Sequence, residues 1–127
     1  MINQNELRIG NLVMGKHLSV RNTIEVYKIA RVNWNGSIMV ENRIGRFEED
    51  MEDDITPIPI TEEWLMKAGF VKDGEGDYCK GDFCFRWQFN ALTLLLDTGH
   101  IKPPLIHLHQ LQNLYFALTG QELNIEI

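Results

Sequence analysis

The chain has 127 residues, 44% hydrophobic and 24% charged, with a formal net charge of −6. This length suits one compact domain or two closely packed subdomains, and the excess of carboxylates disfavours non-specific nucleic-acid binding, which needs Lys and Arg to neutralise phosphates. No apolar run reaches the roughly 20 residues of a membrane-spanning helix and the first residues lack a signal-peptide pattern, so we expect a cytoplasmic protein without membrane contact.

The first half of the chain predicts a β meander. A short apolar strand at Leu12–Met14 follows the turn signal Gly10-Asn11, and β-branched residues dominate the stretch Thr23–Trp34. Alternation along that stretch would place five side chains on one buried face, namely Ile24, Val26, Lys28, Ala30 and Val32. Lys28 is the polar exception on this predicted face.

The strongest turn signal of this half is the dipeptide Asn35-Gly36, which is typical of a type I′ hairpin because both central residues need positive φ. A two-residue loop at this place would pair Val32 with Met39. The sequence therefore predicts a tight hairpin in the middle of the meander.

A further strand, expected at Arg43–Glu48, would bring the meander to three or four short strands, the outline of a small SH3-like barrel. The acidic run Glu48–Asp54 reads as a solvated loop. Two prolines in Ile55–Ile60 predict an extended connector, because proline cannot donate to a sheet ladder. We therefore expect two subdomains, residues 1–56 and 57–127, packed as one compact unit because each alone would be marginally stable.

The second half opens with a predicted helix and continues with strands. Thr61 is a favourable N-cap, acidic residues occupy the first turn, and Gly69 is a natural stop. The segment Phe83–Phe89 alternates strictly between aromatic and other side chains, which predicts a half-buried strand. The apolar run Leu92–Leu96 is expected to lie beside it.

The clearest helical pattern covers His109–Thr119, with Gly120 as its stop and a short final strand expected at Leu123–Ile125. Its apolar face follows the i, i+3, i+4, i+7 spacing at Leu111, Leu114, Tyr115 and Leu118. The order helix, strands, helix, strand predicts a C-terminal antiparallel sheet with two helices on its apolar face. The fold class is therefore α+β.

The two cysteines, Cys79 and Cys84, stand at the ends of a predicted hairpin. If Gly81-Asp82 forms a type II′ turn, the two residues face each other across the strands, which makes a disulfide geometrically conceivable. In a reducing cytoplasm free thiols are the favoured interpretation. A redox-active pair and half of a metal site are the alternatives.

His107 and His109 would share one face if the chain there is extended, and two such histidines can chelate a metal. With Cys79 and Cys84 they are the metal candidates of this sequence. The favoured interpretation is structural, with one imidazole at a helix N-terminus, because no second cysteine or histidine pair stands at zinc spacing. We expect no metal and no other cofactor.

Basic and aromatic residues concentrate in the first half, where they are the candidate for a nucleic-acid interface. They are Arg21, Tyr27, Lys28, Arg31, Trp34, Arg43 and Arg46. An ordinary mixed surface is the favoured interpretation, and the net charge of −6 makes nucleic acid a disfavoured partner.

Three segments, Leu7–Val13, Pro57–Leu65 and His109–Gly120, resemble a family of small uncharacterised proteins from Bacteroides-type gut bacteria and from their phages and prophages. The segments lie in the same order and span nearly the whole chain. The resemblance implies a phage or mobile-element context and expression in the cytoplasm. Because that family has no established activity, the resemblance implies no catalytic residue.

The sequence favours a non-enzymatic interaction module, whose partner would be another protein, because no nucleophile, base and orienting group can be placed together. The first alternative is a nucleic-acid-associated accessory protein that uses the N-terminal β surface. The second is a thiol- or metal-dependent enzyme or redox protein built on the cysteines and a histidine.

Overall fold

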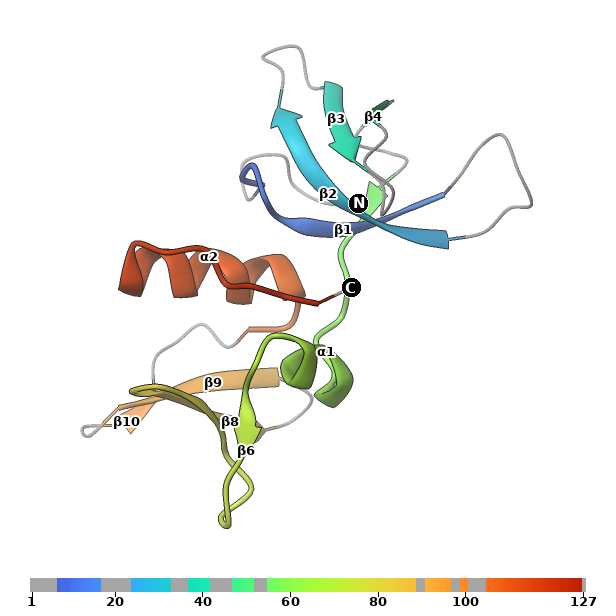
Figure 1. Ribbon diagram of the computed structural model, residues 1–127. Helices are drawn as coiled ribbons and strands as arrows, with labels where there is room; N and C mark the ends of the chain where they lie inside the picture. Colours follow the sequence, from blue (N-terminus) through green and yellow to red (C-terminus); the bar gives the residue numbers. More distant parts are fainter. Residues whose placement is uncertain are drawn as a thin grey trace.

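The computed structural model is an α+β protein with two antiparallel sheets and two helices, which confirms the predicted class (Figure 1). The structure describes residues 7–16, 24–32, 37–41, 47–51, 55–88, 91–96, 99–100 and 105–126. Within these ranges, neither helix has the length and apolar character needed to cross a bilayer.

The first sheet has five strands in the order β4-β3-β2-β1-β5. They are β1 (Leu12–Lys16), β2 (Ile24–Val32), β3 (Ser37–Glu41), β4 (Phe47–Met51) and β5 (Ile55–Thr56). β4 and β5 end the order, so the described strands form an open sheet and not the closed SH3-like barrel that their outline suggests. β5 is short because Pro57 follows it and cannot donate to the ladder.

The buried face of β2 differs from the predicted one. Tyr27 and Ile29 are buried, whereas Lys28 is exposed. Val26 packs instead against the core that the two halves share. Both faces of β2 are therefore covered along part of its length, which a single alternating pattern cannot reveal.

The hairpin between β2 and β3 forms, but its predicted register is wrong. Val32 lies opposite Ile38 and not Met39, and the pairing shifts between Ile29 and Arg31. Five residues separate Val32 from Ile38, whereas a two-residue loop needs an even number between paired positions. The predicted turn at Asn35-Gly36 lies outside the described residues.

The acidic run is not wholly a loop, because β4 contains Glu48, Glu49 and Asp50 and pairs with β3 along its whole length. The predicted strand Arg43–Glu48 overlaps β4 at its end, and residues 42–46 lie outside the described ranges.

The second sheet also has five strands, in the order β10-β9-β8-β7-β6. They are β6 (Val71–Lys72), β7 (Tyr78–Lys80), β8 (Phe83–Gln88), β9 (Ala91–Leu96) and β10 (Gly99–His100). The strands predicted at Phe83–Phe89 and Leu92–Leu96 are confirmed as β8, which covers the first prediction as far as Gln88, and β9; Phe89 lies outside the described residues. β6 and β10 form the two edges of this sheet.

Both predicted helices are present and stop where predicted, and α2 begins at Leu108, one residue before the predicted His109. α1 (Glu62–Lys67) is capped by Thr61, whose hydroxyl accepts a hydrogen bond from the Trp64 backbone N–H at 3.3 Å. α2 (Leu108–Thr119) ends at Gly120 with φ 73°, a left-handed conformation that favours glycine. The strand predicted at Leu123–Ile125 is wrong: this segment is irregular, and its Leu123 side chain is buried.

Helix α2 lies between the two sheets, and a shared hydrophobic core joins them (Figure 1). Leu12 of β1 belongs to this core, together with residues of α1, α2 and the second sheet. A second, smaller cluster is confined to the N-terminal sheet and its flanks, at Leu7, Val13, Tyr27, Ile29, Ile38, Val40 and Ile55.

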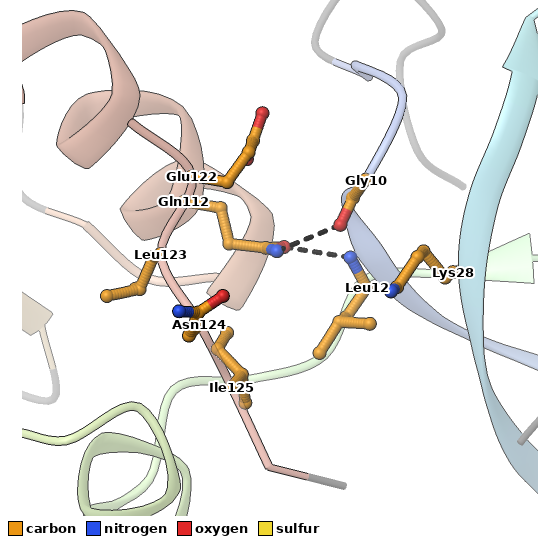
Figure 2. A pocket seen from close by; sticks show the side chains of 8 residues that line it. All are labelled: Gly10, Leu12, Lys28, Gln112, Glu122, Leu123, Asn124 and Ile125. Atoms are coloured by element: carbon orange, nitrogen blue, oxygen red, sulfur yellow. Dashed lines mark hydrogen bonds between the residues drawn. The ribbon is translucent and has the colours of Figure 1, made fainter. Parts of the chain in front are cut away.

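Polar contacts hold the same junction. The Arg8 guanidinium donates to the Asn113 side chain at 2.8 Å and to the Glu122 carboxylate at 2.7 Å. Figure 2 shows the Gln112 side chain between the two halves, where its amide accepts from the Leu12 N–H and donates to the Gly10 carbonyl. The two halves are thus joined by a buried, hydrogen-bonded contact.

Candidate binding cleft beside helix α1

A cleft of about 480 Å³ opens between the start of α1 and the second sheet, and we call it the α1 cleft. Its lining residues are Ile60, Thr61, Glu62, Leu65, Lys72, Gly76, Tyr78 and Trp87. Ligand pockets commonly have volumes of about 300–1,000 Å³ and mix apolar walls with a few polar groups. The α1 cleft meets both criteria.

The cleft exists because the inner face of the second sheet extends beyond the core that covers it. Tyr78 lies opposite Phe85, and Trp87 follows Phe85 at the next position on that face. Phe85 is buried against Phe70 in an edge-to-face contact. Trp87, farther along the strand, keeps 38% of its surface exposed.

Three polar side chains converge on this apolar wall. Tyr78 is buried, and its pKa is raised above 10 because burial disfavours the phenolate and because Glu62 contributes a hydrogen bond and a negative charge. The Lys72 ammonium lies 6.0 Å from the centroid of the Tyr78 ring. The cleft therefore offers one anion, one cation and a protonated phenol beside an exposed indole.

A smaller cavity of about 160 Å³ lies at the junction of the two halves (Figure 2). Gly10, Leu12 and Lys28 line it from the first half. The C-terminal side contributes Gln112, Glu122, Leu123, Asn124 and Ile125. The Gln112 side-chain amide is hydrogen-bonded to the backbone of the first half. We therefore assign this cavity to the structural junction between the two halves.

The predicted opposition of Cys79 and Cys84 is confirmed, and the two sulfurs form a disulfide. The expectation of free thiols is therefore wrong for this structure. The hairpin turn at Gly81-Asp82 brings the cysteines into register, with Lys80 opposite Phe83. The Asp73 carboxylate lies 3.9 Å from the Cys79 sulfur.

The two candidate histidines lie side by side, with their rings stacked at 5.8 Å between centroids. His107 is the N-cap residue of α2, where its backbone N–H donates to the Gln110 side chain at 2.9 Å. His109 is buried within the first turn. In the described part of the chain, no three His, Cys, Asp or Glu side chains are grouped as a metal site would need.

One of the two aromatic residues of the predicted basic and aromatic surface, Tyr27, does not lie at the surface. Tyr27 is 1% exposed and belongs to the core of the first sheet, so it cannot stack on a nucleobase. Lys28 and Arg31 are exposed on β2. The remaining candidates, Arg21, Trp34, Arg43 and Arg46, lie outside the described residues.

None of the residues that line the α1 cleft was singled out for function by the sequence. The aromatic alternation of residues 83–89 places Trp87 on a half-buried face, and the sequence indicates Glu62 only as an acidic residue of the first helical turn. Ile60 and Thr61, which precede α1, lie near strand β8 only in the folded chain. The spacing of residues along the sequence therefore could not indicate the cleft.

Comparison with known proteins leaves the family of this chain open: no family model matches it, and neither the curated proteins nor the solved structures contain a significant match.

Proposed function

We propose that this protein is a non-enzymatic interaction module that binds another protein through the α1 cleft. The observation that carries the proposal is the exposure of Trp87 inside that cleft. Half-exposed tryptophan beside an apolar depression is typical of protein-binding surfaces, where a few aromatic anchors supply most of the binding free energy.

The charged groups of the cleft can fix the orientation of a bound segment. Glu62 and Lys72 carry opposite charges on the same lining, so a bound segment can be positioned by both. Thr61 is already engaged as the helix cap, and its hydroxyl belongs to the fold. This arrangement suits an apolar side chain of the partner between polar neighbours.

The proposal includes a phage or mobile-element origin and a cytoplasmic location. Both rest on the resemblance of the segments Leu7–Val13, Pro57–Leu65 and His109–Gly120 to the family of small proteins named above. In that compartment the cysteines would meet a reducing thiol pool.

The test is affinity capture from lysate of the native host with three baits: the wild-type protein, Trp87→Ala and Leu118→Ala. Leu118 is a matched control, since it is an exposed apolar residue of α2 that does not line the cleft. We expect a protein that the wild type and Leu118→Ala enrich equally and that Trp87→Ala retains at least tenfold less. Capture that is equal for all three baits, or no reproducible capture, would overturn the proposal.

A further inference from the structure

Strand β6 presents an unpaired edge beside the α1 cleft. It is the last strand of the second sheet and pairs only with β7 among the described strands. The Asp73 N–H donates to the Asp77 carbonyl at 2.8 Å, which makes those two residues a hydrogen-bonded pair. Bonded and non-bonded pairs alternate along an antiparallel ladder, so Lys72 and Tyr78 form a non-bonded pair.

The neighbouring ladder supports this assignment. Cys79 and Cys84 have their Cα atoms 4.1 Å apart, the short separation of a non-bonded pair. The pair next to them, Tyr78 and Phe85, is then bonded, and the Tyr78 backbone faces β8. It follows that the N–H and C=O of Lys72 both point away from β7, toward the free edge.

The edge is open to solvent. Val71 is 67% exposed, and Lys72 is exposed as well. Outside the ladder with β7, no hydrogen bond joins the Lys72 backbone to any described residue. A donor and an acceptor from one residue are therefore available side by side, which is what an added strand requires.

The same geometry places the α1 cleft under this edge. Lys72 and Tyr78 are directly opposed, so their side chains lie on one face of the sheet, and both line the cleft. A residue of an added strand that pairs with Lys72 would direct its side chain to that face. Backbone pairing and insertion into the cleft are thus compatible in one bound segment.

We propose that the partner contributes an extended segment that adds to β6 as a further strand of the second sheet. The partner residue opposite Lys72 exchanges two backbone hydrogen bonds with it and directs a large apolar or aromatic side chain into the cleft beside Lys72 and Tyr78. Other side chains of the partner reach Trp87, which lies two strands farther into the sheet. The inference rests on the proposed function, because it names the kind of protein segment that the α1 cleft binds.

The probe is a library of random linear dodecapeptides selected on the full-length protein. The affinities of selected peptides are then measured by fluorescence anisotropy for the wild type and for Lys72→Ala, Lys72→Pro and Trp87→Ala. Proline removes the outward N–H, and it is tolerated at edge positions whose N–H is not in the ladder. Lys72→Ala is its control, since it removes the side chain and keeps the N–H.

We expect Trp87→Ala to weaken peptide binding about tenfold or more, and Lys72→Pro to weaken it about tenfold or more relative to Lys72→Ala, which lacks the same side chain but keeps the N–H. Two measurements on the wild-type protein do not depend on how well the variants fold. Methylation of the peptide nitrogen that pairs with Lys72 should weaken binding about tenfold. The Lys72 amide should exchange with deuterium at least tenfold more slowly in the complex.

The contrary outcomes separate this inference from the proposed function. If Trp87→Ala weakens binding while Lys72→Pro and peptide methylation do not, the cleft binds protein without strand addition, and only this inference fails. If no linear peptide is selected, strand addition by a short segment is refuted, and affinity capture still decides the proposed function. If the protein dimerises and Lys72→Pro makes it monomeric, the occupant is a second copy, and the inference is likewise overturned.

Discussion

The side-chain amide of Gln112 joins the last helix to the first strand. Its oxygen accepts from the Leu12 N–H at 2.8 Å, and its nitrogen donates to the Gly10 carbonyl at 3.0 Å. Gln112 is 2% exposed, and both backbone groups would lose this protein partner if the amide were removed. Buried polar groups in that state are costly.

We therefore expect Gln112→Ala to lower the free energy of unfolding by about 2–4 kcal/mol. The matched control is Gln121→Ala, which truncates an exposed glutamine and should change stability by less than about 0.5 kcal/mol. Urea unfolding followed by circular dichroism measures both. Equal effects of the two substitutions would show that the amide does not hold the halves together.

Tyr78 carries a second prediction at the scale of a residue, because its pKa in the folded protein is raised above 10 by burial and by Glu62. Well below pH 10 the phenol is protonated in both states, so this group leaves stability unchanged. Above that pH the unfolded chain loses the proton first, and the free energy of unfolding falls as the pH rises toward the folded pKa. Tyr78→Phe should remove this part of the alkaline destabilisation.

The contribution of Glu62 can be measured separately. Glu62→Gln removes a charge that raises the pKa of Tyr78, so the phenolate absorbance near 295 nm should appear at lower pH. Glu63→Gln is the control, since Glu63 pairs with Lys67 and is absent from the causes of the shift. A titration that moves equally in both variants would contradict the assignment.

The β7–β8 hairpin shows what local sequence decides at the scale of an element. The spacing of the cysteines and the turn at Gly81-Asp82 predicted that Cys79 and Cys84 would be opposed, and they are. The spacing of the cysteines in the sequence did not decide whether they form a disulfide, because disulfide formation also depends on the redox compartment. The structure contains the disulfide.

Removal of this disulfide should weaken the fold without abolishing it. Cys79→Ala combined with Cys84→Ala should lower the free energy of unfolding by about 2 kcal/mol or less, because the loop that the bond closes is short. The far-UV circular dichroism should stay the same, and thiol titration of the wild type should detect two thiols only after reduction. Loss of the folded spectrum on reduction would contradict this prediction.

Other elements show where local reasoning failed. The helix caps at Thr61 and Gly120 were predicted correctly, because each acts within one turn of its own helix. The predicted strand Arg43–Glu48 overlaps only the start of β4, because the acidic composition of the rest resembles a loop, and sheet pairing overrode that preference. The final strand at Leu123–Ile125 was wrong because apolar residues there are buried without a neighbouring strand.

The whole molecule should unfold as one unit, since the shared core contains Leu12 from the first half. Leu12→Ala should cost about 2–5 kcal/mol. In a Trp34→Phe background, fluorescence comes only from Trp64 and Trp87 of the second half. If the halves are coupled, Leu12→Ala should shift the fluorescence midpoint in urea as much as the far-UV midpoint. A fluorescence midpoint that stays fixed would show independent subdomains.

From the sequence alone, the α+β class, both helices with their ends and the central strands of the second sheet could be predicted. These features depend on periodicity and on caps and turns that act over a few residues. Tertiary structure decided the rest: which face of β2 is buried, how Arg8 reaches Asn113 across 105 positions, and that Trp87 is exposed beside α1. Such features depend on packing between distant segments, and a local pattern carries no information about which distant segment will cover it.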